Sequence, residues 1–390
     1  MLTKRLHLKK ILSFNDTKIE LGQLNVLIGP NAVGKTNLIE VISLLQAAPT
    51  SISRAIERGG GVRQWLWLGD STPPVATIEC DLELSRGGYD GPLKYRLEFS
   101  QEAYRFVIVR EQLCDGGSLG GTSGSFFLRT SDSVEFGPPP VELSDKPSLT
   151  KASVPAYGSV LSLFKSPLDP TPITRVGIHF EQIRIFREFQ TGPLSSARHG
   201  ISTGLEDALA NGSDNLALVL LHADFRDMHD RIREYLRRFC ERFENVNVDV
   251  SEGFARTYLS EAGLVEKLSA MRMSDGTLKF LSLLAALFHP KPPPLMCIEE
   301  PEIGLHPDAV QLVAEALLEA SESMQLIVTT HSDALIDALT DRPDTVLVCE
   351  RDFDNGTQMK RLSKEDLKEW LERYTLGELW RKGEIGGGRW

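Results

Sequence analysis

Short apolar runs alternate with segments of helical spacing in both halves of the chain. Residues 24–28 are mostly apolar and rich in branched side chains, a pattern typical of a strand buried on both faces. Residues 37–46 then carry apolar side chains at helical spacing. Two more apolar runs, residues 295–298 and 326–330, predict further buried strands. This alternation predicts an α/β fold around a β-sheet core.

Alternating apolar and polar positions predict antiparallel strands in the first third of the chain. Residues 2–28 contain two or three strands, and residues 75–83 and 93–109 predict an antiparallel pair. We therefore expect a mixed sheet, with an antiparallel β lobe at residues 71–115.

The middle of the chain differs in composition and predicts an inserted, partly helical lobe at residues 116–259. Gly, Ser and Pro are abundant in residues 115–160, which predicts irregular loops around one short strand at 126–129. Residues 224–243 predict an amphipathic helix with arginines on its polar side. Its apolar stripe, which we expect in the core, consists of Phe225, Met228, Ile232, Tyr235, Leu236, Phe239 and Phe243.

The segment between the first buried strand and its helix carries the pattern G-x-x-x-x-G-K-T at residues 29–36. In a strand–loop–helix context, backbone N–H groups and the positive end of the helix dipole converge on phosphate oxygens. Lys35 is expected to reach the β- and γ-phosphates, and the Thr36 hydroxyl to bind Mg²⁺. The pattern therefore predicts a nucleoside triphosphate site. Its expected binding residues are Gly29, Pro30, Asn31, Gly34, Lys35, Thr36 and Asn37.

Two adjacent acids, Glu299 and Glu300, follow the apolar run at residues 295–298. Successive side chains of a strand point to opposite faces, so the two carboxylates are expected to have different roles. Glu299 is placed to hold Mg²⁺, directly or through water. Glu300 is expected to orient and polarise the attacking water. An apolar strand that ends in two acids is the Walker B arrangement, in which the residue on the metal side is usually Asp. Because this chain has the longer Glu299 there, we expect slow hydrolysis of the nucleotide.

Two further polar motifs complete the pattern. His331 follows the apolar run at residues 326–330, where it is expected to contact the γ-phosphate and the catalytic carboxylate. Ser274 opens an apolar helical segment 25 residues before Glu299. Helix capping alone would explain this serine. The alternative is an anion site at the helix N-terminus, formed by residues 274–277.

Composition limits the class of protein. The chain has 390 residues, 41% hydrophobic and 25% charged, with a net charge of −11. These values are ordinary for a globular protein, and no apolar run is long enough to span a bilayer. The five cysteines show no metal-binding spacing, and the N-terminus does not resemble a signal peptide. We therefore expect a cytoplasmic protein without membrane contact.

Two clusters of basic residues are candidates for contact with DNA, because phosphate binding depends on clustered Lys and Arg. For each cluster, the alternative is an ordinary solvated face. The clusters consist of Lys4, Arg5, Lys9 and Lys10, and of Arg226, Arg231, Arg233, Arg237, Arg238 and Arg242.

Together the motifs resemble the ABC-type ATPases of the RecF, OLD and coiled-coil repair group. The matching segments are residues 29–36, 274–277, 295–302, 304–307 and 330–332. Glu-Glu-Pro-Glu followed by Gly-Leu-His-Pro looks like the OLD-like branch, in which the second motif lies at a dimer seam. A transporter cassette is disfavoured, because its signature typically follows the lysine by about a hundred residues, against 239 here.

The resemblance implies an ABC-ATPase head formed by residues 1–70 and 260–350, with a helical cap at 351–390 and ATP and Mg²⁺ as cofactors. It also implies a homodimer or higher homo-oligomer, in which the signature of one copy clasps the γ-phosphate held by the other. That signature consists of Ser274, Asp275, Gly276 and Thr277. A glutamine that senses the nucleotide is also expected, and Gln64 is the nearest candidate in the sequence.

About forty residues follow Cys349, too few for the nuclease domain of OLD proteins. We therefore expect an ATP-driven switch for an effector, such as a nuclease, that a separate protein supplies, as in two-gene phage-defence systems. Double-stranded DNA is a possible further partner. The alternatives are a RecF-like DNA-repair ATPase and a scaffold that binds ATP without hydrolysing it.

Overall fold

The computed structural model describes residues 2–84, 91–116, 124–130, 133–137, 152–153, 155–163, 171–204, 208–222, 226–352 and 354–386. Some sequence predictions fall outside these residues: most of the turn at 87–91, the glycine-rich run at 117–123, the prolines at 138–140, Phe225 and the tail at 387–390.

Five parallel strands form one end of the main sheet, with the first of them at the edge of the sheet. In spatial order they are β10 (Arg184–Phe186), β15 (Leu295–Glu299), β16 (Gln325–Thr329), β3 (Leu24–Ile28) and β17 (Val346–Asp352). Alternate residues of each strand face opposite sides. In β15, Met296 and Ile298 join one hydrophobic core, and Leu295 and Cys297 join the other. The three apolar runs of the sequence are therefore strands buried on both faces, as predicted.

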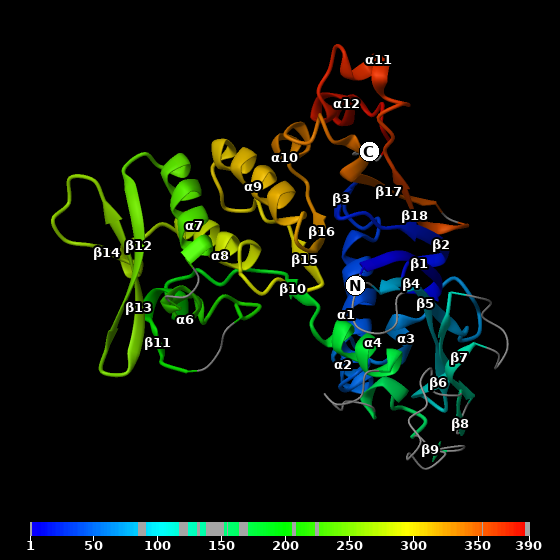
Figure 1. Cartoon of the computed structure of the whole chain (residues 1–390). Coiled ribbons are helices and arrows are strands. Elements are labelled where there is room, and N and C mark those ends of the chain that lie inside the picture. Colours follow the sequence, from blue (N-terminus) through cyan, green and yellow to red (C-terminus); the bar gives the residue numbers. More distant parts are fainter. Residues whose placement is uncertain are drawn as a thin grey trace.

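Beyond β17 the same sheet continues with antiparallel strands (Figure 1). These are β18 (Gly356–Arg361), β2 (Phe14–Glu20), β1 (Leu2–Ile11), β4 (Ala76–Leu84), β5 (Gly91–Glu102), β6 (Arg105–Asp115), β7 (Ser125–Thr130), β8 (Ser133–Phe136) and β9 (Ala152–Ser153). The expected mixed sheet is confirmed.

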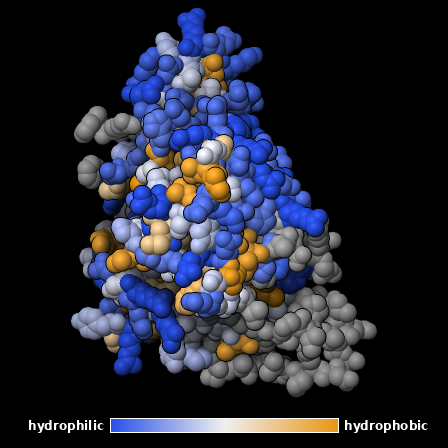
Figure 2. Space-filling model, turned by 90° about the vertical axis from the view of Figure 1, so that its left-hand side faces the viewer, coloured by the Kyte–Doolittle hydropathy of each residue, from blue (hydrophilic) through white to orange (hydrophobic). Residues whose placement is uncertain are grey.

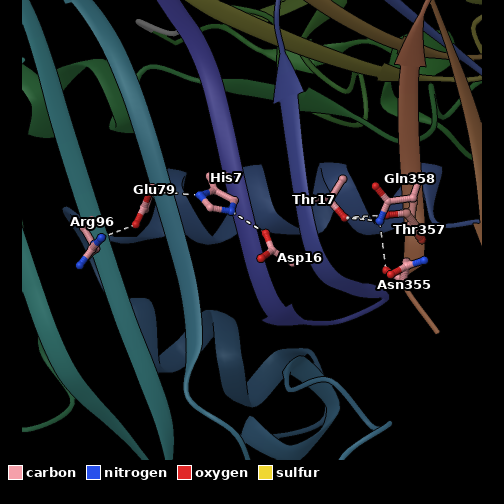
Figure 3. A network of polar contacts seen from close by, with 8 residues as sticks. All are labelled: His7, Asp16, Thr17, Glu79, Arg96, Asn355, Thr357 and Gln358. Carbon is pink, nitrogen blue, oxygen red and sulfur yellow. Dashed lines mark hydrogen bonds and ion pairs between the residues drawn. The ribbon is translucent and has the colours of Figure 1, made fainter.

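Polar contacts cross the antiparallel strands on one face, as Figure 3 shows. The His7 ring lies between Asp16, 2.6 Å from its Nε2, and Glu79, 3.2 Å from its Nδ1. Arg96 pairs with Glu79 from the next strand. The first basic cluster lies on these strands, and three of its four members are paired with acids: Lys4 with Glu83, Arg5 with Asp81 and Lys10 with Asp70.

Helices cover both faces of the sheet. One core contains residues from α1 (Lys35–Ala47), α2 (Ile52–Arg58), α3 (Val62–Trp65) and α4 (Pro172–Glu181). The other contains residues from α6 (Leu216–Leu221), α7 (Arg226–Phe239), α8 (Asp275–Leu287), α9 (Pro307–Ala320), α10 (Asp333–Asp337) and α12 (Leu376–Lys382). A short α11 (Lys368–Leu371) precedes α12.

A second, smaller sheet forms a lobe beside α6 and α7 (Figure 1). It contains a hairpin of β12 (Phe243–Ser251) and β13 (Phe254–Glu261), which β11 (Ile201–Ser202) and β14 (Leu268–Ser269) extend; α5 (Ser196–His199) packs nearby. Figure 2 faces this side of the molecule and shows apolar patches among polar residues. The exposed apolar side chains of the hairpin and the loop after it are Val250, Phe254, Leu264 and Val265.

The amphipathic helix predicted at 224–243 is α7, but it ends at Phe239. Phe243 instead begins β12, so its inclusion in the helix was wrong. The apolar pattern extends past the helix because Phe243 stacks on Phe239, which stacks on Phe280 of α8. Two of the five arginines of α7 join it to α9: Arg238 pairs with Glu315, and Arg231 pairs with Glu319. This pairing favours the structural interpretation of the second basic cluster.

The middle of the chain, predicted as an insertion, contributes β10 to the main sheet and α4 to its helical layer. At the other end, the segment after β18 packs back on α10. Asp337 Oδ1 accepts the Gly377 N–H at 2.8 Å and also accepts the Thr375 hydroxyl. No helix of the described residues combines the length and apolar character needed to cross a membrane.

His179 of α4 makes the free energy of unfolding depend on pH. It is buried beside Phe180, and neither ring nitrogen hydrogen-bonds to a described residue. Burial lowers the pKa of this imidazole to about 3, below the ordinary value of 6.5. The folded protein therefore keeps the ring neutral, whereas the unfolded chain takes up a proton below about pH 6.5. Stability from this group is complete above that pH and falls as the pH decreases.

We expect the free energy of unfolding to fall by about 0.8 kcal/mol between pH 7.5 and 6.0 through His179 alone. Urea unfolding of the wild type and of His179→Leu at both pH values measures this term. The wild type should lose more stability than the variant over this interval. Equal losses would show that His179 does not titrate on unfolding.

Candidate nucleotide site

The phosphate loop connects β3 to α1, as the sequence predicts. Gly29 and Gly34 have φ angles of 144° and 106°, which favour glycine. A Cβ on Gly29 would lie 2.4 Å from the Cys349 carbonyl oxygen, and one on Gly34 would lie 2.3 Å from Thr357 Oγ1. Both glycines are therefore required by the close approach of β17 and β18 to the loop.

Lys35 lies across this loop. Its ammonium donates hydrogen bonds to the carbonyl oxygens of Gly29 at 2.7 Å and Pro30 at 2.9 Å. The side chain is buried, which lowers the pKa of the ammonium below its ordinary value. Asn31 is exposed on the loop. Asn37 is directed elsewhere: its amide donates to Ser13 Oγ at 2.7 Å and so braces the start of α1.

The two residues expected to bind Mg²⁺ lie together. Thr36 Oγ1 donates to Glu299 Oε2 at 3.3 Å, although 263 positions separate them in the chain. The other carboxylate oxygen, Oε1, is buried and accepts no hydrogen bond from a described residue. Burial raises the pKa of Glu299, and Arg187 and Thr36 oppose this shift. A hydroxyl and a buried carboxylate with a spare oxygen are suitable ligands for Mg²⁺.

Glu300 and His331 meet at the carboxyl ends of β15 and β16. Nε2 of His331 lies 3.7 Å from Oε1 of Glu300. Glu300 has a φ of 45°, in the left-handed region that non-glycine residues rarely occupy, and its N–H bonds to the Thr329 carbonyl at 3.0 Å. Strained backbone of this kind is concentrated at functional sites. Both side chains are partly exposed, so a water or phosphate could reach them.

Glu302 supports this arrangement and is absent from the residues predicted to form the site. Its Oε1 accepts the Thr330 hydroxyl at 2.6 Å and the His331 N–H at 3.1 Å. Burial raises the pKa of its carboxyl group. Glu302 therefore fixes the backbone that presents His331. Its place in the Glu-Glu-Pro-Glu motif was the available signal.

The residues of the expected signature lie at the N-terminus of α8. Ser274 caps this helix, accepting the Thr277 N–H at 3.0 Å, and Asp275 pairs with the buried Arg198. The Arg198 guanidinium also donates to the Met273 carbonyl at 2.7 Å. In Figure 1, α8 and α1 lie on opposite sides of β10 and β15. The structure therefore does not bring the signature to the phosphate loop of the same chain.

The signature helix contacts the segment after Glu302. A Cβ on Gly276 would lie 3.0 Å from the Gly304 carbonyl oxygen. Lys279, one turn further along α8, donates to the Ile303 carbonyl at 2.7 Å. Lys279 also donates to the Glu300 carbonyl at 3.4 Å, so α8 holds both ends of the segment from Glu300 to Ile303.

Sequence reasoning missed the residues that follow β10, the strand beside β15. Arg187 lies 3.8 Å from Glu299. Gln190 lines a cavity of about 550 Å³ together with Arg187, Glu40 and Trp65. Gln64, the candidate from sequence, is an exposed residue of α3. Gln190 is exposed like Gln64, but it lies three residues after Arg187 and shares this cavity with it.

This fold and these motifs define a P-loop ATPase with the architecture of an ABC-type head. The fold matches the SMC head bound to the C-winged-helix domain of ScpA, with a TM-score of 0.58 and 14% identity, over 94% of this chain and 99% of that one. A second SMC head, with an extended coiled coil and bound to the C-terminal domain of ScpA derived from Pyrococcus furiosus, gives a TM-score of 0.56 and 13% identity over 95% and 98%.

More specifically, residues 24–337 match the family described as "AAA domain, putative AbiEii toxin, Type IV TA system", and the chain belongs to this family. It is also similar to the OLD nuclease of Thermus scotoductus, with 21% identity over 96% of this chain and 67% of that protein. A shorter match to the Old nuclease of Escherichia phage P2 is 37% identical and covers 19% of this chain and 12% of that protein. The expected membership of the OLD and SMC-like ATPase group is confirmed.

Proposed function

We propose that this protein is an ATP-hydrolysing switch in which two copies enclose two ATP molecules. The observation that carries this proposal is the division of its motifs. Lys35, Glu299 and Glu300 occupy the loop and strand ends of one site, whereas Ser274 opens a helix on the other side of β15. A capped helix N-terminus suits a phosphate group, so a second copy could supply the missing wall.

Within this scheme each residue has a defined task. The loop N–H groups and Lys35 would hold the phosphates, and Thr36 and Glu299 would hold Mg²⁺, which neutralises charge on the β- and γ-phosphates when bound. Glu300 would orient the attacking water, and His331 would position the Glu300 carboxylate beside the γ-phosphate. The signature residues would close the site from the second copy.

We further propose that the switch controls an effector protein such as a nuclease in antiphage defence. The similarity to OLD nucleases and the toxin-related family support this output. Seven of the ten residues of the two basic clusters are paired with acids. This pairing favours a protein effector over extensive contact with DNA phosphates.

The test is mass determination by light scattering, with and without ATP, Mg²⁺ and duplex DNA, on the wild type and Glu300→Gln. The variant should form a stable dimer in ATP and Mg²⁺, whereas the wild type should return to its starting mass as ATP is consumed. If neither ATP nor DNA changes assembly or turnover, the switch proposal is wrong. A scaffold that does not hydrolyse ATP would assemble equally well with both proteins.

A further inference from the structure

Arg187 lies next to the candidate metal ligand because of the strand register. Phe186 of β10 pairs with Ile298 of β15, so the following residues, Arg187 and Glu299, are neighbours at the carboxyl ends of these strands. Nε of Arg187 lies 3.8 Å from Oε1 of Glu299, too far for a hydrogen bond. The guanidinium is therefore a positive charge beside the buried oxygen that is available to a cation.

The same guanidinium has a second acidic partner. Its Nη1 donates to Oε1 of Glu40 at 2.6 Å. Glu40 is four residues after Thr36 on α1, so both lie on the same face of the helix. Arg187 thus lies between Glu299, which belongs to the candidate metal site, and Glu40, which lies outside it.

The geometry leaves Arg187 able to move between these partners. Its side chain is 46% exposed, against 17% for Glu299. Arg187 and Glu40 both line the cavity of about 550 Å³ beside α1. By contrast, Glu299 is fixed by its position at the end of β15 and by the Thr36 hydroxyl.

We propose that Arg187 is a positioning residue that competes with a divalent cation for Glu299, and that Glu40 restrains it. This inference rests on the proposed function, because it concerns the same Mg²⁺ site. A cation that binds Thr36 and Glu299 is repelled by the guanidinium beside them. Glu40 weakens this competition by giving Arg187 another partner. Without Glu40, the guanidinium would turn to Glu299.

The two residues of this ion pair should therefore have opposite effects on metal binding. The experiment measures binding of Mn²⁺ by electron paramagnetic resonance, with the protein saturated by a non-hydrolysable ATP analogue. Arg187→Gln should lower the half-saturating Mn²⁺ concentration by about threefold, and Glu40→Gln should raise it by about threefold, as expected for partly exposed ion pairs. Arg187→Lys, which keeps the charge, should stay close to the wild type.

The double variant separates this mechanism from a direct effect of the Glu40 charge. If Glu40 acts through Arg187, adding Glu40→Gln to Arg187→Gln should change nothing further. A Glu40 effect that persists in the double variant, or single variants that shift in the same direction, would overturn the proposal. If the wild type binds neither the analogue nor Mn²⁺, the proposed function fails. If it binds both and all variants match it, only the role of Arg187 fails.

Discussion

Replacing Glu300 by glutamine is expected to lower ATP turnover by at least about a hundredfold, the scale of general acid–base contributions to catalysis. Glu300 directly follows β15, and its carboxylate lies 3.7 Å from Nε2 of His331, where it can polarise a water. Glutamine has the same shape and retains the backbone, including the N–H bond to Thr329 at 3.0 Å. Only the ability to accept a proton and carry charge is removed. Phosphate release at saturating ATP and Mg²⁺ measures the loss.

Equilibrium binding of ATP should persist in this variant, because Lys35 and the loop are unchanged. Glu322→Gln is a matched control, since Glu322 is an exposed acid outside the candidate site and should leave turnover unaltered. Turnover within a few-fold of the wild type in Glu300→Gln would remove Glu300 from the mechanism. Loss of ATP binding together with turnover would instead indicate a folding defect.

The parts of the site that sequence predicts are those in which local pattern and local structure coincide. The phosphate loop is continuous in the chain, and its glycines are required by positive φ angles and close contacts. Glu299, Glu300 and His331 are predicted because each comes at or just after the end of a strand whose apolar run is buried on both faces. Parallel strands place their carboxyl ends at one edge, so neighbouring strands bring these residues together.

Arg187 and Gln190 were missed because they follow β10, a strand that the sequence pattern does not predict. β10 contains three residues, Arg184–Phe186, too few to show a strand period. It becomes a strand because it pairs with β15, more than a hundred positions away in the chain. Arg187 owes its place beside Glu299 to that pairing, and Gln190 follows it in the same segment. Only knowledge of the sheet order could have identified them.

Charge patterns were similarly incomplete as guides. The arginines of α7 suggest a nucleic-acid surface until α9 is placed beside them with Glu315 and Glu319. The sequence cannot distinguish a solvated cation from one that joins two helices. The same limit applies to Glu40, whose partner Arg187 lies 147 positions away.

Mixing two inactive variants is expected to restore ATP turnover if two copies share each site. Lys35→Ala removes the ammonium that we propose binds the phosphates, and Ser274→Arg places bulk and charge at the N-terminus of α8. In a mixed dimer, one site combines the intact loop of one copy with the intact signature of the other. With equal amounts and free exchange, half of the dimers are mixed and each has one complete site, so turnover should reach about a quarter of the wild-type value.

The control for this complementation keeps Ser274→Arg in a chain that also carries Lys35→Ala. Mixed with Lys35→Ala alone, this double variant offers no intact loop, so turnover should stay absent. Loss of the serine cap costs about 1 kcal/mol, and urea unfolding of each variant checks that it still folds. If the first mixture is no more active than its separate components while both variants fold and exchange subunits, the signature acts within its own chain or not at all. Recovery in that mixture alone would place Ser274 at the γ-phosphate of the second copy.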